Sequence, residues 1–287
     1  IYNFKYSILT SRTESNLFKD ENIDKIQIKN LLDFFFRIKD LSNHINYFSV
    51  IHIHGIWAPI QIFSILLCNF KKKKYIIHPH GMLLDEALRS AGLLKYLYKK
   101  IFLFFFKFFI TKYTSFISIT DQEKSAIEKY FPKSIITKIY NPIPFKKIKF
   151  DTSGKKKQFV YFGRIHPHKN IDLIINAFKE ADLGQEWSLK IYGIEDDKKY
   201  HEKLLQLIGT DIRIQIKKPV FEEKKQSILN ESWLNLLLSK SEVLSLSVLE
   251  SSIYGLPSLA NENLEMKNIE DSILTSKTSI SEIKKKL

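Results

Sequence analysis

Several residue types are scarce in this 287-residue chain, and each scarcity excludes a class of protein. The single cysteine, Cys68, excludes an intramolecular disulfide and a cysteine-rich zinc site, so a reducing, cytoplasmic setting is expected. The low counts of 9 glycines and 8 prolines exclude a collagen-like or linker-rich chain. No apolar run reaches the ~18 residues that span a bilayer, since the nearest one, 101–110, is short and contains Lys107. The composition therefore predicts an ordinary globular protein.

The charge is the unusual property of this composition. Lys+Arg 45 against Asp+Glu 31 gives a net charge of +14, which favours anionic partners such as phosphate-bearing substrates, nucleic acid or an acidic membrane surface. No helix-turn-helix, zinc-finger or RNP pattern accompanies the charge, so we expect no nucleic-acid partner.

Short apolar runs and amphipathic stretches alternate along the chain in two series, which predicts an α/β fold with two doubly wound parallel sheets. The prolines of 141–144 (NPIP) interrupt the alternation, and we interpret the lysine-rich stretch 146–157 as a linker between domains 1–148 and 149–287. Strands are expected at 49–53, 75–77, 115–119, 135–140, 159–162, 188–192, 212–216 and 234–238, and helices at 58–69, 84–110, 121–131, 171–180, 200–208, 222–229 and 248–254.

The segment 162–170 (FGRIHPHKN) joins a predicted strand to a predicted helix. Gly163 lets the backbone turn, and the cations Arg164 and Lys169 follow it. Parallel α/β folds bind ligands at the carboxyl ends of their strands, and a helix N-terminus adds a partial positive charge. The pattern therefore predicts a diphosphate site, with two solvated loop cations as the alternative.

A second step from strand to helix lies at 239–250 (SKSEVLSLSVLE), where Ser247 is expected to be the N-cap. Glu242 and Glu250 have the chemistry to accept hydrogen bonds from vicinal sugar hydroxyls. A structural role is the alternative for each glutamate, because each follows a serine, Ser239 or Ser247, at the capping-box spacing.

Six motifs follow one another along the chain: 52–59 (HIHGIWAP), 78–83 (HPHGML), 116–120 (FISIT) with Glu123, 141–143 (NPI), 162–164 (FGR) with Lys169, and 239–250 with Gly255-x-Pro257. In this order they together resemble the retaining GT-B glycosyltransferases of family 4, also called glycosyl transferases group 1. The resemblance runs through most of the chain. It implies a GT-B fold of two Rossmann-like domains facing a cleft, with 1–148 on the acceptor side and 149–287 binding a nucleotide-sugar donor.

The resemblance also implies a reaction: transfer of a hexose-type sugar, with retention, from a nucleotide-diphosphate sugar to a glycan or lipid-linked acceptor in surface polysaccharide or lipopolysaccharide biosynthesis. Arg164 and Lys169 would neutralise the departing diphosphate, so neither a metal nor another cofactor is expected. Glu250 would hold the ribose, Glu242 would approach the donor sugar, and His80 would lie beside the transferred sugar. The expected catalytic residues are Arg164, Lys169, Glu242 and His80, and the expected donor-binding residues are Gly163, Arg164, Lys169, Ser247, Val248, Leu249 and Glu250.

The sequence also departs from the family pattern. It begins without Met, and 6–10 resembles the second strand of the N-domain, so the opening strand and its glycine-rich loop are expected to be missing. Asn170 replaces a family glycine, Val243 replaces another, and the residues after Asn261 diverge from the usual continuation. Both domains are therefore expected to be trimmed at their outer ends, and an inactive or binding-only chain is the first alternative function.

Histidine supports a second alternative. Six of the 8 histidines form His-x-His pairs, at 52/54, 78/80 and 166/168. Alternate residues of a strand share a face, so one pair could hold the metal of a metal-dependent hydrolase. No aspartates follow at a recognisable spacing, so the expectation is loop or core histidines, with His80 the functional one.

The segment 94–112 alternates lysines with aromatic and aliphatic residues. One interpretation is an interfacial helix attracted to anionic lipid, peripheral on the inner face of the cell membrane. The other is a core helix between two strands, and both stay open because the lysines do not fall on one helical face.

Overall fold

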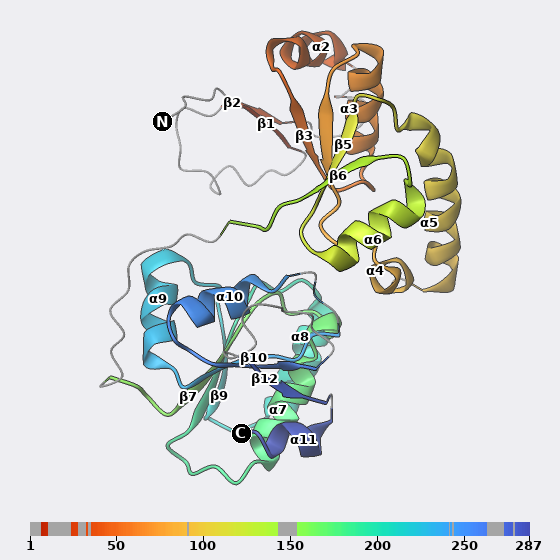
Figure 1. The fold of residues 1–287 in the computed structure, drawn as a ribbon. Helices are drawn as coiled ribbons and strands as arrows, with labels where there is room; N and C mark the ends of the chain where they lie inside the picture. The colour runs from red at the N-terminus through yellow and green to blue at the C-terminus, as the bar shows by residue number, and fades with distance from the viewer. Residues whose placement is uncertain are drawn as a thin grey trace. The chain divides into compact units, whose positions relative to one another are not determined.

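The computed structural model describes residues 7–10, 24–27, 33, 36–90, 92–142, 154–240, 242, 244–262, 273–277 and 279–287. The chain divides into two compact units, Ile1–Asn141 (unit 1) and Pro142–Leu287 (unit 2), drawn as ribbons in Figure 1. The division falls at the prolines that interrupt the strand–helix alternation of the sequence. The linker predicted at 146–157 lies mostly outside the described residues.

Unit 1 contains a four-stranded parallel sheet in the order β3-β4-β5-β6, and β1 with β2 forms a separate parallel pair. The four strands of the larger sheet begin and end within two residues of the predicted bounds. The elements of unit 1 are β1 (Ser7–Thr10), β2 (Asp24–Gln27), α2 (Ile38–Tyr47), β3 (Ile51–His54), α3 (Pro59–Phe70), β4 (Tyr75–His78), α4 (Asp85–Arg89), α5 (Leu93–Phe106), η2 (Lys107–Phe109), β5 (Thr114–Ser118), α6 (Asp121–Tyr130) and β6 (Ile135–Lys138).

The core of unit 1 forms where its strands meet α3, α5 and α6. Ile77 of β4 and Phe116 of β5 are fully buried against side chains such as Phe106 of α5. Cys68 of α3 lies in the same cluster, and burial raises the pKa of its thiol to about 12. Cys68 is therefore a small buried residue of the core and not a nucleophile.

The single helix predicted at 84–110 is wrong. The structure divides it into α4, a turn, α5 and the short η2. The turn contains Gly92, whose φ of +90° lies in a region that residues with a Cβ rarely adopt. No helix in the described part of the chain is both long and apolar enough to cross a membrane.

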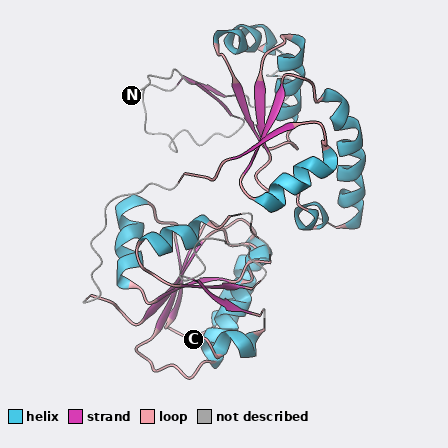
Figure 2. Ribbon diagram, in the orientation of Figure 1, coloured by secondary structure: helices cyan, strands magenta, loops and turns pink. Residues whose placement is uncertain are grey.

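Unit 2 contains a six-stranded parallel sheet in the order β12-β11-β10-β7-β8-β9, with helices on both faces (Figure 2). The predicted strands and helices of this unit begin and end within two residues of the observed ones, whereas β11, β12 and α11 were not predicted. Its elements are β7 (Gln158–Phe162), η3 (Pro167–Lys169), α7 (Ile171–Glu180), β8 (Ser188–Tyr192), α8 (Lys198–Ile208), β9 (Ile214–Lys217), α9 (Glu222–Glu231), β10 (Leu234–Leu237), α10 (Leu246–Ile253), β11 (Ser258–Asn261), β12 (Ile273–Ser276) and α11 (Ile280–Lys284).

Strand β7 lies in the middle of this sheet and is buried on both faces. Phe159 and Tyr161 pack into the cluster that contains Phe178 of α7, whereas Val160 and Phe162 pack into the cluster on the α9 face. Because alternate residues of a strand point to opposite faces, a strand covered on both sides must be apolar throughout.

The chain changes direction across the sheet between β7 and β10. These two strands are parallel neighbours, but β8 and β9 extend the sheet on one side and β11 and β12 extend it on the other. In open α/β sheets, ligands bind at the carboxyl ends of the two strands that flank such a switch point. We therefore expect a ligand site in the loops that follow Phe162 of β7 and Leu237 of β10.

Candidate functional site

The loop after β7 carries the first two predicted site residues, Gly163 and Arg164. A Cβ placed on Gly193, at the end of β8, would lie 2.2 Å from the carbonyl oxygen of Gly163, so only glycine permits this approach of the two loops. The Arg164 guanidinium donates to Asp196 at 2.8 Å and stays largely exposed. Arg164 thus lies at the strand end as predicted, already paired with a carboxylate.

Asn170 ends this loop in the left-handed conformation, with φ 51° and ψ 39°. Asparagine is one of the few residues besides glycine that tolerate this region, which explains physically how it replaces the family's glycine. Its amide nitrogen donates to the carbonyl oxygen of Leu238 at 2.9 Å. Asn170 therefore ties the β7–α7 loop to the end of β10.

Lys169 and Glu242 meet at this switch point as an ion pair. Their side chains are only 13% and 18% exposed, and Ser239 donates its hydroxyl to the same Glu242 oxygen at 2.7 Å. The capping box predicted from the spacing of Ser239 and Glu242 does not form, because the described residues between β10 and α10 are not helical. Glu242 instead acts as an acceptor that joins the two loops.

Tyr161, at the end of β7, stabilises the loop that carries Arg164. Its hydroxyl donates to the carbonyl oxygen of Arg164 at 2.9 Å. Burial, and next the negative charge of Glu242, raise the pKa of Tyr161, so the phenol stays protonated at neutral pH. The backbone that positions Arg164 is therefore held by a buried neutral donor.

The predicted start of α10 is wrong. Helix α10 begins at Leu246, and Ser245, not Ser247, is the N-cap: its hydroxyl accepts from the amide of Val248 at 3.5 Å. The amide of Leu249 donates to the Ser245 carbonyl oxygen at 3.1 Å. Of the three amides predicted to face a ligand, that of Ser247 occupies a first-turn position, where a helix supplies no partner of its own.

Glu250 points from α10 toward α9, where it forms an ion pair with Lys225. The capping box predicted between Ser247 and Glu250 does not form, since Ser247 lies inside the helix. The motif residue Glu250 is thus held by a cation that sequence reasoning did not single out.

His80 belongs to unit 1, whereas the other predicted site residues belong to unit 2. It lies just beyond β4 with φ +53°, and its Nε2 is 2.7 Å from Nδ1 of His54. Glu123, fully buried in α6, accepts from the amides of Gly81 at 2.5 Å and Ile119 at 2.7 Å. Glu123 therefore fixes the backbone next to His80.

A cavity of about 420 Å³ adjoins the ion-pair site of unit 2. Asn170 and Lys240 line it on the side of the site, and Tyr200 and Lys203 of α8 line the other side. The amide of Lys240 donates to the carbonyl oxygen of His168 at 2.9 Å, so the cavity wall is continuous with the loops that hold Lys169 and Glu242.

The partners of the predicted residues are what sequence reasoning missed. Asp196 and Lys225 hold Arg164 and Glu250 from 32 and 25 positions away along the chain, and no sequence pattern marks such distant partners. Glu123 was named as part of a motif, but its contact with the amide of Gly81, 42 positions away, was not predicted. Ser239 was signalled by its spacing from Glu242, but that spacing suggested a different contact.

Three comparisons with known proteins show what this chain is similar to. Residues 143–270 match the family model described as Glycosyl transferases group 1. A relative, the uncharacterized 41.2 kDa protein in the cps region of Klebsiella pneumoniae, is 23% identical over 261 residues, covering 80% of this chain and 64% of the relative. The chain thus spans slightly less than two thirds of that relative's length.

Solved structures show the same fold. WaaG, a glycosyltransferase involved in lipopolysaccharide biosynthesis, matches with a TM-score of 0.73 at 12% identity, over 98% of this chain and 80% of the WaaG chain. HepE from Anabaena, solved in complex with UDP, matches with a TM-score of 0.69 at 13% identity, over 92% of this chain and 75% of the HepE chain.

The fold is therefore α/β with parallel sheets, as in GT-B glycosyltransferases such as WaaG. The Glycosyl transferases group 1 model matches residues 143–270, and Arg164, Lys169, Glu242 and Glu250 lie within the matched residues.

Proposed function

We propose that the chain is a retaining family 4 glycosyltransferase that transfers a hexose-type sugar from a nucleotide-diphosphate sugar to a glycan or lipid-linked acceptor. The observation that carries the proposal is the convergence of Arg164, Lys169 and Glu242 on the switch point of a group 1 domain. The UDP bound by HepE supports the donor class. WaaG and the cps-region relative support a role in surface polysaccharide or lipopolysaccharide biosynthesis.

The chemical problem in this reaction is the negative charge that builds up on the departing nucleoside diphosphate. Arg164 and Lys169 are fixed cations that stabilise this charge electrostatically, without a metal ion. Each now faces a carboxylate, Asp196 or Glu242, so donor binding exchanges or shares these partners. An exchange at Lys169 turns Glu242 toward the hydroxyls of the donor sugar.

The remaining motif residues complete the proposed donor site. The first-turn amide of Ser247 binds a phosphate oxygen. Glu250 accepts from the ribose hydroxyls in place of Lys225. Retention follows from attack on the face of the sugar that the leaving group departs from. For His80 we propose the role that the resemblance implies, beside the transferred sugar.

Calorimetric titration with UDP, GDP and their sugar conjugates tests the donor site. We expect Arg164→Ala and Lys169→Ala each to weaken binding of the preferred nucleotide about 10- to 100-fold, because each removes a charge-assisted hydrogen bond. Lys157→Ala is the matched control, since Lys157 forms an exposed ion pair with Glu186 before the opposite end of β7. Equal affinities in all three variants would contradict the assignment.

Turnover separates the enzyme from a binding-only chain. With the preferred donor and an acceptor extract, we expect release of the nucleoside diphosphate, and NMR of the product should show the anomeric configuration of the donor. Inverted product would disprove retention. Tight donor binding with no released diphosphate would favour the binding-only alternative.

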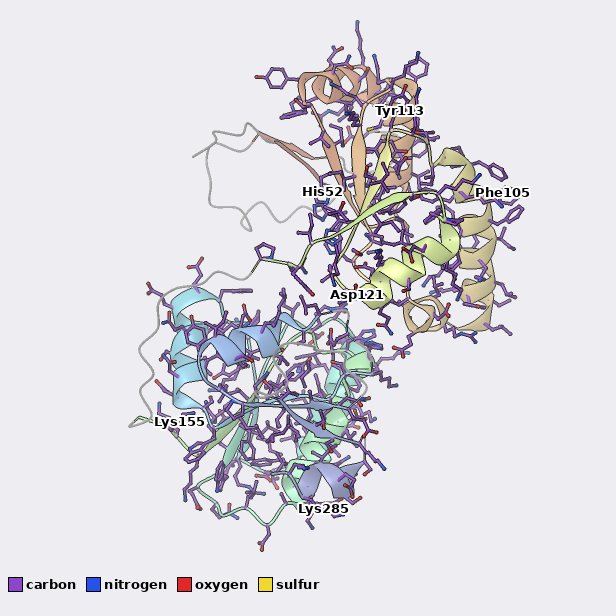
Figure 3. All side chains as sticks on the ribbon, viewed as in Figure 1. His52, Phe105, Tyr113, Asp121, Lys155 and Lys285 are labelled. Carbon is purple, nitrogen blue, oxygen red and sulfur yellow. The ribbon has the colours of Figure 1, made fainter. Side chains whose placement is uncertain are left out.

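We further propose that unit 1 docks on the anionic cytoplasmic face of a membrane through α5 and η2. The support is a stripe of exposed apolar side chains whose positions differ by four, three, four and three residues: Leu94, Tyr98, Ile101, Phe105 and Phe108. Figure 3 labels Phe105, whose ring projects from α5 away from the rest of unit 1. The opposite face of α5, including Leu103 and Phe106, is buried in the core, so neither sequence interpretation of 94–112 describes the helix completely.

The charge around this stripe suits anionic lipid. Lys95 and Lys107 are exposed on α5 and η2, and Lys112 is exposed just beyond. Apolar insertion flanked by lysines is the usual basis of reversible binding to acidic bilayers. The combination of exposed aromatic rings and lysines supports a lipid surface as the partner.

Vesicle flotation tests this surface. We expect binding to phosphatidylglycerol-containing vesicles but not to pure phosphatidylcholine vesicles, with a clear loss in Phe105→Ser and Phe108→Ser. The control is Ile212→Ser, since Ile212 is equally apolar and exposed but lies in unit 2. Binding that is the same for both lipids, or for stripe and control variants, would rule the proposal out.

A further inference from the structure

Four imidazole rings gather at one end of the unit 1 sheet. Strands β3 and β4 pair in parallel with His54 opposite His78, and His52 lies two residues before His54 on the same face. The rings stack in pairs, with centroids 4.3 Å apart for His52 and His54 and 3.7 Å apart for His78 and His80. His52, labelled in Figure 3, marks the place of this group, which we name the histidine cluster: His52, His54, His78 and His80.

One ring nitrogen of the cluster is buried without a partner. Among the described residues, Nε2 of His78 has no hydrogen-bond partner, and His78 is only 6% exposed. An imidazole nitrogen removed from water and left unpaired is unfavourable, so such an atom points to a ligand that completes it.

We propose that His52, His54 and His78 bind one divalent transition-metal ion of the zinc type. Their three candidate donor atoms lie within 4.8 Å of one another. The set consists of imidazole nitrogens without a carboxylate, which suits Zn²⁺, Ni²⁺ or Cu²⁺ and does not suit Mg²⁺ or Ca²⁺. His52 and His54 are exposed, so the ion enters from solvent and their rings can turn toward it.

Ion binding needs only a modest adjustment of these rings. Nitrogens on a tetrahedral zinc ion lie about 3.3 Å apart, since each Zn–N bond is about 2.0–2.1 Å. Rotation of the two exposed rings closes the remaining distance while buried His78 stays in place. His80 adjoins the site through His54, since its Nε2 lies 2.7 Å from Nδ1 of His54.

This site differs from the metal-free expectation drawn from sequence, and all of its residues belong to unit 1. In the sequence, nothing distinguishes the three His-x-His pairs from one another as candidate metal ligands. The structure brings two of them together from β3 and β4 and leaves 166/168 in the other unit. The sequence alone could not show that β3 pairs with β4. This pairing brings His54 within hydrogen-bond distance of His80, 26 positions further along the chain.

Calorimetric titration of the tag-free full chain with ZnCl₂, after treatment with a chelator and gel filtration, tests the proposal. We expect one Zn²⁺ per chain, at least tenfold weaker binding in His52→Ala and in His54→Ala, and no binding of MgCl₂. His44→Ala is the matched control, because His44 lies in the same unit on α2 and outside the cluster. Its zinc affinity should equal that of the unchanged protein.

Zinc X-ray absorption provides the second readout. We expect a first shell of three or four imidazole nitrogens, reduced by one in His54→Ala. No zinc binding, equal affinity in the cluster and control variants, or a shell without histidine would each overturn the proposal. Far-UV circular dichroism checks that each variant is folded, and whichever of His52→Ala and His54→Ala is folded decides the result.

Discussion

At the scale of single residues, Glu123 is the side chain on which the His80 loop most depends. Its carboxylate is fully buried and accepts from the amides of Gly81 and Ile119. Removing it with Glu123→Ala leaves two buried amides without an acceptor, which costs about 1–3 kcal/mol of unfolding free energy. We expect this loss in urea denaturation at pH 7.

Glu123 also makes the stability of the folded protein depend on pH. Burial raises its pKa above the usual 4.5, and the two amides counteract this only in part. The folded state therefore holds the proton more tightly, so this contribution to stability is complete below pH 4.5 and is lost as the pH rises through the raised pKa. Relative to Glu123→Gln, which does not titrate, the unchanged protein should become less stable between pH 4 and pH 8.

The measured quantity is the difference in unfolding free energy between the unchanged protein and Glu123→Gln, because the titrations of all other groups cancel in this difference. Urea denaturation midpoints at each pH provide the two free energies. Glu128→Gln, on the exposed side of α6, should give a flat difference. A flat difference for Glu123→Gln as well would show that burial does not perturb this carboxyl.

The site residues could be predicted individually but not their contacts. Arg164, Lys169, Glu242 and Glu250 follow strand ends or start helices, and local pattern is enough to mark such positions. The ion pair of Lys169 with Glu242 joins residues 73 positions apart, which only the pairing of β7 with β10 brings together. Local periodicity contains no information about that pairing.

At the scale of elements, strands were predicted better than helix ends. Runs of Val, Ile and Phe bounded by polar residues mark β4 and β7 clearly. The start of α10 was wrong because Ser245 and Ser247 are both good N-caps, and packing of the helix chooses between them. The helix at 84–110 was wrong because the helical periodicity continues across Gly92, where the backbone turns.

The contact between the β7 and β8 loops gives a prediction about elements. Gly193→Ala places a methyl group against the Gly163 carbonyl, so the strand ends must separate. We expect a loss of about 1–3 kcal/mol of unfolding free energy. Gly154→Ala is the control, since nothing lies within 4 Å of its added methyl. Urea denaturation that gives equal midpoints for the two variants would contradict the clash.

At the scale of the whole molecule, the buried apolar clusters of the described residues each lie within one unit. Those around Phe116 belong to unit 1 and those around Phe178 to unit 2. Each unit thus buries a core of its own, the condition for independent unfolding.

Calorimetry of the full chain tests this independence. Phe116→Ala and Phe178→Ala should each cost about 3–5 kcal/mol, because each leaves a cavity in a fully packed core. We expect two transitions, with each substitution lowering only one of them. A single transition lowered equally by both would show that the units unfold together.

Cys68 makes the opening of the unit 1 core measurable. It is the only thiol in the chain, it is fully buried in unit 1, and its high pKa keeps it protonated. A thiol reagent therefore reacts only when the core of unit 1 opens. The rate of labelling, followed by mass spectrometry, reports how often one half of the native molecule exposes its interior, without any engineered probe.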